Sequence, residues 1–99
     1  MTSFARPRKH AVPASSESVT LPSGVALHAR PAAAFVKTAL KFQSRVTVGI
    51  DGKLADAKSI LAVLALGAVG GTMLRLSAEG DDAPEALAAL ATCVSGLIE

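Results

Sequence analysis

The spacing of apolar residues in this 99-residue chain switches several times between the period of a strand and the period of a helix. The order of these segments restricts the fold more than any other feature of the sequence. Apolar and polar residues alternate over 18–21, 45–50 and 74–79, which is typical of half-buried strands. Apolar residues recur every three to four positions over 32–41 and 83–98, which predicts amphipathic helices. A returning strand at 53–57 and a short helix at 60–66 complete the order β-α-β-β-α-β-α. This order predicts an α+β fold, a four-stranded antiparallel sheet covered on one face by three helices.

Turn and cap residues support these boundaries. Asp51-Gly52 predicts a tight hairpin turn, because both residues tolerate positive φ. Ser59 is placed to cap the short helix and Gly67 to end it. Gly70-Gly71 predicts a further turn. Asp82 is placed to cap the last helix. The apolar face of the first helix is expected to consist of Ala32, Phe35, Val36, Ala39 and Leu40.

The composition excludes several classes of site. Aromatic residues make up 3% of the chain, with no Trp and no Tyr, so the core must be aliphatic and base-stacking platforms are nearly absent. The single cysteine, Cys93, excludes an internal disulfide and a cysteine metal cluster. Neither of the two histidines lies in a motif with the spacing of metal ligands. We therefore expect no metal and no cofactor, and a free thiol suits a reducing compartment.

The positive charge is concentrated at one end. Residues 1–16 contain Arg6, Arg8 and Lys9 and lack a periodic apolar pattern, so we interpret them as a flexible N-terminal arm before one domain at 17–99. The rest of the chain is close to neutral, which argues against nucleic acid as a partner, although binding through the arm stays open as an alternative. The longest apolar stretch, 60–71, is too short to span a bilayer. We therefore expect a cytoplasmic monomer with no membrane insertion.

His28 is the residue best placed for chemistry. It lies where a loop becomes a helix, and a helix N-terminus with its unpaired N–H groups favours an anion. Arg30 follows two residues later and can bind a phosphate with two hydrogen bonds, and Pro31 is tolerated in the first turn. A neutral imidazole is a nucleophile that could accept a phosphoryl group. A histidine that caps the helix or packs in the core is the alternative interpretation. A small phosphatase is disfavoured, because no acid–base partner for His28 is evident.

The segments LHARPAAAFVK (27–37), DGKLADAKSIL (51–61), LG (66–67) and LSAEGDDAPEAL (76–87) carry a resemblance. Over about residues 17–99 the chain resembles the HPr family, the phosphocarrier proteins of the bacterial phosphoenolpyruvate-dependent sugar phosphotransferase system. The resemblance implies an open-faced β-sandwich. It also implies that His28 takes a phosphoryl group on Nδ1 from phosphorylated enzyme I and passes it to sugar-specific IIA proteins or domains, while Arg30 stabilises the phosphate.

The resemblance further implies a docking surface and a regulatory site. The family's contact positions match Ala29, Ala33, Ile60, Leu61, Leu64 and Gly67. The short helix at 60–66 is apolar all round, so one of its faces is expected to be exposed. Ser59 matches a serine that an ATP-dependent kinase modifies in many relatives, and a helix cap is the alternative interpretation of it. A regulatory HPr-like protein, with a serine kinase or a transcription regulator as partner, is the alternative function. It could serve a nitrogen branch, carbon catabolite control through Ser59, or a dihydroxyacetone kinase system.

One segment departs from the family pattern. The family has glycine immediately before the Leu-His pair, in a short Asn-x-Gly-Leu-His-type loop. Here Ala26 holds that position, and we expect residues 23–28 to form a loop that is two residues longer. The loop before His28 is therefore expected to have a different shape, which bears on partner choice.

Overall fold

A computed structural model describes residues 14–97 of the chain. Its elements occur in the predicted order β-α-β-β-α-β-α. The strands are β1 (Ala14–Thr20), β2 (Arg45–Ile50), β3 (Lys53–Asp56) and β4 (Met73–Glu79), and the helices are α1 (Ala29–Ala39), α2 (Ile60–Leu66) and α3 (Ala83–Ser95). The predicted fold class is confirmed.

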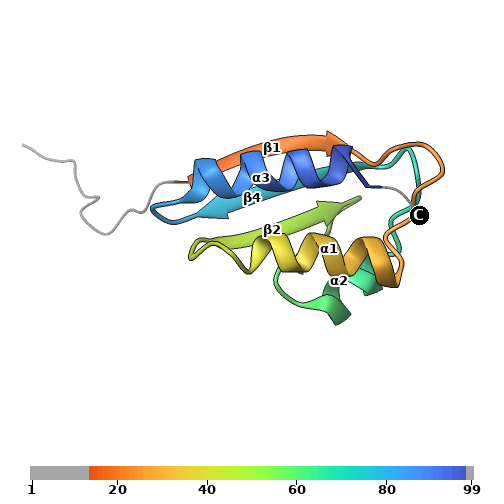
Figure 1. Ribbon diagram of the computed structural model, residues 1–99, viewed down its shortest axis with the longest axis horizontal. Helices are drawn as coiled ribbons and strands as arrows, with labels where there is room; N and C mark the ends of the chain where they lie inside the picture. Colours follow the sequence, from red (N-terminus) through yellow and green to blue (C-terminus); the bar gives the residue numbers. More distant parts are fainter. Residues whose placement is uncertain (1–13, 98–99) are drawn as a thin grey trace, which may run out of the picture.

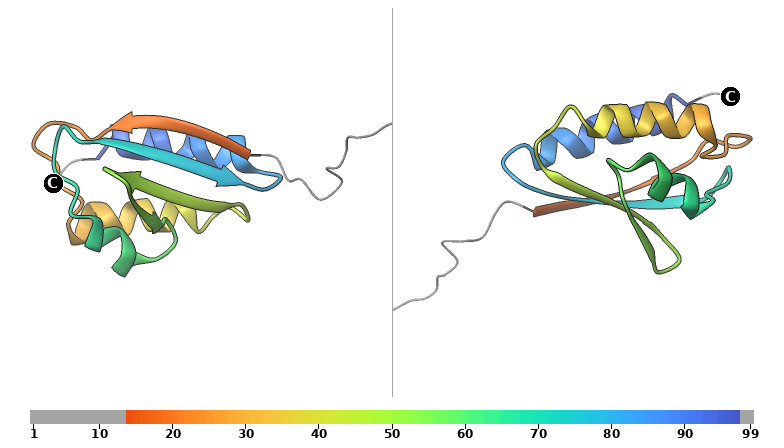
Figure 2. Two further views of the ribbon diagram at one scale, coloured as in Figure 1. Left: turned by 180° about the vertical axis from the view of Figure 1, so that it is seen from behind. Right: turned by 90° about the horizontal axis from the view of Figure 1, so that it is seen from below.

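The four strands form one antiparallel sheet in the order β1-β4-β2-β3. The register places Val48 of β2 opposite Leu76 of β4, and Val19 of β1 opposite Leu74. Since side chains alternate across a strand, this register collects the apolar residues on one face. Helices α1 and α3 lie side by side over that face, and the other face is left uncovered by helices (Figures 1 and 2).

The core between the sheet and the helices is almost entirely aliphatic, as the composition predicted. Phe35 of α1 is the only aromatic residue among its fully buried side chains within residues 14–97. Leucines, valines and alanines supply the rest, among them Leu74, Leu76, Leu90, Val46, Val48 and Val63. Alanines let α3 lie close to the sheet, and a small chain can therefore bury this core with few large side chains.

Leu40 corrects the predicted apolar face of α1. The helix ends at Ala39, and Leu40 follows as its C-cap and is exposed. At about 100° per residue, Leu40 lies beyond Val36, outside the stripe that runs from Phe35 to Val36, and the chain turns toward β2 immediately after it. The other four predicted positions of the apolar face are buried.

The N-terminal boundary of the sheet lies earlier than the sequence suggested. Residues 14–16, which the sequence assigned to the arm, belong to β1 and pair with residues 77–79 of β4. Their side chains carry no apolar alternation, so it is backbone pairing with β4 that extends the strand. Residues 1–13 lie outside the described part of the chain.

Asp82 corrects the predicted cap of α3. It occupies the N-cap position, but its carboxylate forms no capping hydrogen bond among the described residues. Instead it accepts hydrogen bonds from the backbone N–H groups of Gln43 and Ser44, each at 2.9 Å, and from the Ser44 hydroxyl. Asp82 therefore ties the turn between α1 and β2 to the turn between β4 and α3, a contact between residues nearly forty positions apart.

This contact predicts a stability that depends on pH. The Ser44 hydroxyl and the Gln43 and Ser44 N–H groups hold the pKa of Asp82 below its ordinary value. Because the folded pKa is lower than the unfolded one, the stabilisation is present above the ordinary aspartate pKa of about 3.9 and is lost as pH falls through the folded value. We expect Asp82→Asn to unfold at lower urea concentration than the parent at pH 7, with the difference shrinking toward pH 2.

Asp81→Asn provides the matched control, because Asp81 is an exposed neighbour whose carboxylate takes no part in this contact. Its urea midpoint should follow that of the parent across the same pH series. A difference between Asp82→Asn and the parent that stays constant from pH 7 to pH 2 would contradict the role of the ionised carboxylate.

Candidate functional site

His28 stands at the N-terminus of α1, on the surface. It is the N-cap residue, with an extended backbone (φ −87°, ψ −168°), and its carbonyl accepts the first helical hydrogen bond from Ala32 N–H at 2.8 Å. Its own N–H donates to the Ala26 carbonyl at 2.8 Å. Among residues 14–97, the imidazole makes no capping hydrogen bond and is exposed. The imidazole therefore neither caps the helix through a side-chain hydrogen bond nor packs in the core, and it is open to solvent.

The first turn of α1 provides an environment for an anion next to this ring. The amides of Ala29 and Arg30 precede the first intrahelical hydrogen bond, which Ala32 makes, and Pro31 has no N–H to leave unpaired. The first turn, which the structure describes in full, contains no acidic residue. The positive end of the helix dipole stabilises an anion in such a position by about 0.3–1 kcal/mol when it is exposed.

Arg30 adds a permanent positive charge to the same turn. Its side chain is exposed, and within residues 14–97 it forms no ion pair that would compete for the guanidinium. Two N–H groups of a guanidinium can bind two oxygens of one phosphate. The arrangement can hold a phosphoryl group on or beside the imidazole, but it contains no acidic group placed to activate water.

An apolar surface lies next to this turn. Helix α2 packs beside the beginning of α1 (Figure 1), and it buries Val63 and Leu66 while leaving Leu61 77% exposed. Ile60 is 37% exposed and Leu64 is half-buried. We call the following residues the docking surface, after the role that the family resemblance implies for them: Ala29, Ala33, Ile60, Leu61, Leu64 and Gly67. They are all at least partly exposed. An exposed leucine beside an exposed isoleucine is a feature of many protein-binding sites.

Ser59 and Gly67 set the two ends of α2. The Ser59 hydroxyl accepts a hydrogen bond from Ala62 N–H at 3.2 Å, so Ser59 is a helix cap, as one of its two interpretations held. Gly67 ends the helix with φ 66°, a conformation that other residues adopt at a cost. Ser59 is half-buried at the margin of the docking surface.

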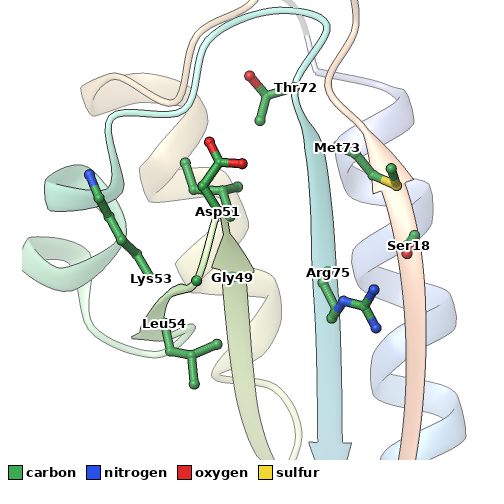
Figure 3. Close-up of a pocket in the computed structure, with 10 residues that line it drawn as sticks. Ser18, Gly49, Asp51, Lys53, Leu54, Thr72, Met73 and Arg75 are labelled. Carbon is green, nitrogen blue, oxygen red and sulfur yellow. The ribbon is translucent and has the colours of Figure 1, made fainter.

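His28 and Arg30 both lie exposed on the surface. A pocket of about 400 Å³ lies elsewhere, on the uncovered face of the sheet, and Figure 3 shows Leu54, Met73 and Arg75 among the residues that line it. Neither His28 nor Arg30 lines this pocket. An exposed imidazole beside an apolar surface suits a reaction with another protein rather than with an enclosed small molecule.

Two further observations concern metals and membranes. Among residues 14–97, no cluster of three or more histidine, cysteine or acidic side chains is arranged to hold a metal ion. None of the helices in that part of the chain has the length and hydropathy needed to cross a bilayer.

Sequence reasoning missed the residues that hold the loop before His28. The N–H of Leu27 donates to the carbonyl of Ala68 at 2.9 Å, which fastens the loop to the segment between α2 and β4. The sequence signal in that segment was Gly70-Gly71, and it predicted only a turn. A backbone acceptor such as the Ala68 carbonyl leaves no trace in the amino-acid pattern.

Comparisons with known proteins agree on one family. The family model for the PTS HPr component phosphorylation site matches residues 15–95. The phosphocarrier protein HPr of Buchnera aphidicola is 42% identical over 79 residues, which cover 80% of this chain and 91% of that protein.

Solved structures extend the comparison. An HPr structure from Thermoanaerobacter tengcongensis has a TM-score of 0.79 at 43% identity, covering 82% of this chain and 91% of its own. The catabolite repression HPr of Bacillus subtilis has a lower TM-score of 0.65 at 39% identity, covering 85% of this chain and all of its own.

Proposed function

The chain belongs to the HPr family, the phosphocarrier proteins of the phosphotransferase system, and on that premise we propose that His28 is the residue that carries the phosphoryl group. The observation that supports this most directly is the exposed imidazole at the N-terminus of α1, with Arg30 in the same turn and no acid in that turn. The partners that we propose are enzyme I as donor and IIA proteins or domains as acceptors. The compartment that we propose is the cytoplasm, in keeping with the free thiol of Cys93.

The proposed reaction is a pair of phosphoryl transfers. Nδ1 of neutral His28 bonds to phosphorus while the bond between phosphorus and the donor breaks, and the same group later leaves to an acceptor on the next protein. The guanidinium of Arg30 and the amides of the first turn of α1 stabilise the negative oxygens in both steps. Water is not activated, because no acidic side chain lies in that turn. The phosphoryl group therefore stays on the carrier until a partner docks.

Phosphorylation in a reconstituted system tests the proposal. The chain is incubated with phosphoenolpyruvate, Mg²⁺ and enzymes I from several bacteria, and intact-mass and fragment spectra are recorded before and after acid treatment. We expect a gain of one phosphate that is acid-labile and located on His28. Phosphate on any other residue, or no gain with any enzyme I, would refute the assignment.

Ser59 is proposed as a regulatory position of the same surface. A phosphate there would add about −1.5 to −2 charges at the margin of the docking surface. Such a charge beside exposed Ile60 and Leu61 would oppose docking of an apolar partner surface. Incubation with ATP and a serine kinase of the phosphotransferase system, followed by mapping of the phosphate, tests this role.

The docking surface predicts a selective loss of transfer in Leu61→Asp. Leu61 is 77% exposed, so the fold should tolerate the change, but an unpaired charge would lie in the apolar contact. We expect the second-order rate constant for phosphorylation by enzyme I to fall about tenfold to 100-fold, the usual loss at a central interface residue.

Leu54→Asp is the matched control for Leu61→Asp. Leu54 is 75% exposed, almost the same as Leu61, but it lies in β3 and lines the pocket on the uncovered face of the sheet. Its transfer rate should stay within about twofold of the parent. Equal losses in the two variants would argue that α2 is not the surface that partners contact.

A further inference from the structure

We propose that Gly70 is a positioning residue for His28: it lets the loop at 22–27 lie against the segment at 67–72 at a distance that no larger residue permits. This inference rests on the proposed role of His28 as phosphoryl acceptor. Gly70 touches neither the phosphoryl group nor a partner in this account, and it acts through the backbone of the loop that ends at His28.

Two segments far apart in the sequence run side by side at one end of the molecule (Figures 1 and 2). One joins β1 to α1 and carries His28, and the other joins α2 to β4. They are fastened at both ends by backbone hydrogen bonds. At one end Leu21 N–H donates to Thr72 O at 2.9 Å and Gly71 N–H to Leu21 O at 3.0 Å, and at the other end Leu27 N–H donates to Ala68 O at 2.9 Å.

Gly70 lies between these two fastenings. A Cβ atom on Gly70 would stand 2.6 Å from the nitrogen of Gly24, 3.0 Å from the carbonyl oxygen of Pro22 and 3.1 Å from the nitrogen of Val25. All three are backbone atoms, so no side-chain rotation relieves the contact.

Close approach, and not backbone conformation, is the reason for glycine here. Gly70 is absent from the glycines with positive φ, so its backbone would accept an alanine. The next residue shows the opposite case, because Gly71 has φ +85° and open space around its missing Cβ. The requirement at position 70 is therefore set by the neighbouring loop alone.

The loop has little freedom to move away from an added methyl group. Val25 donates its N–H to Pro22 O at 3.1 Å, and the side chains of Val25 and Leu27 are buried in the core. His28 follows Leu27 directly. A displacement of the loop at Gly24 must therefore reach His28, or break the hydrogen bond between Leu27 and Ala68.

Gly70→Ala tests the proposal. We expect the rate of phosphorylation by enzyme I to fall about tenfold to 100-fold, since a misplacement of about 1 Å can cost that much. The rate is measured below the melting temperature of the variant, where the protein is folded. A purely structural role would lower the melting temperature and leave the rate of the folded protein unchanged.

Gly96→Ala is the matched control. Its backbone φ is −96°, and an added Cβ would meet its nearest neighbour, Thr92 O, at an ordinary 3.5 Å. We expect the parent rate in this variant. In the parent chain, an NMR spectrum should show a strong nuclear Overhauser effect between the Gly70 α-protons and the Gly24 amide, and Gly70→Ala should shift the Leu27 and His28 amide resonances.

The possible results distinguish failure of the role of Gly70 from failure of the role of His28. A Gly70→Ala rate within twofold of the parent, or no Overhauser effect between Gly70 and Gly24 in the parent, would overturn the role of Gly70 while leaving His28 as the acceptor. A His28→Ala variant that still accepts phosphate would refute the proposed function itself. A reduced rate with shifted His28 resonances would support the inference.

Discussion

Replacing His28 with alanine should abolish acid-labile phosphorylation, with a fall in the rate of about 10³-fold or more. The change removes the nucleophile that we propose at the first turn of α1, and the guanidinium of Arg30 and the helix amides cannot form a bond to phosphorus. Intact-mass spectrometry after incubation with phosphoenolpyruvate, Mg²⁺ and enzyme I measures the result. Because the imidazole is exposed and forms no capping hydrogen bond among residues 14–97, the urea midpoint should change little.

His10→Ala is the control that the chain itself provides. His10 is the second of the two histidines and lies outside the described residues, in the segment that the sequence assigns to a basic arm. Phosphorylation of His10→Ala should proceed at the parent rate. Phosphate retained in His28→Ala and lost in His10→Ala would move the site to the arm and refute the assignment.

The parts of the site that the sequence predicted are those set by local chemistry. His28 and Arg30 lie within one turn of helix, so their proximity follows from spacing alone. The exposure of Leu61 follows because a short helix that is apolar all round cannot bury every side. The cap at Ser59 and the end at Gly67 follow from the preferences of those residue types.

The parts that the sequence could not predict depend on contacts between distant segments. Asp82 precedes a helix and was expected to cap it, but two N–H groups nearly forty residues away compete for its carboxylate. The Gly70-Gly71 pair predicts only a turn, while the constraint on Gly70 comes from the backbone of Gly24. Leu40 continues the helical spacing of α1 but falls just beyond its last residue. In each case the local sequence pattern fits the expected helix or turn. The actual role of the residue is set by a contact with a distant segment or by the point where the helix ends.

Leu74→Ala should lower the free energy of unfolding by about 2–5 kcal/mol. Leu74 lies in β4, is 0% exposed, and faces the helices opposite Val19. The change to alanine reduces the buried apolar area. It also leaves a cavity, because the close-packed alanines around it are too small to fill the space. Domains of this size are stable by about 5–15 kcal/mol, so the variant should be marginal at 37 °C. Urea unfolding at 25 °C, followed by circular dichroism, measures the change.

Leu54→Ala is the same chemical change on the other face of the same sheet. Leu54 of β3 is 75% exposed and lies over Gly49, with its Cδ2 atom 2.7 Å from the place where a Cβ of that glycine would stand. We expect a loss below about 1 kcal/mol, because little apolar area returns to water. The two leucines thus compare the covered and the uncovered face directly. Equal losses would mean that α1 and α3 do not pack on the face that carries Leu74, and a fold with α1 elsewhere would no longer hold His28 beside the docking surface.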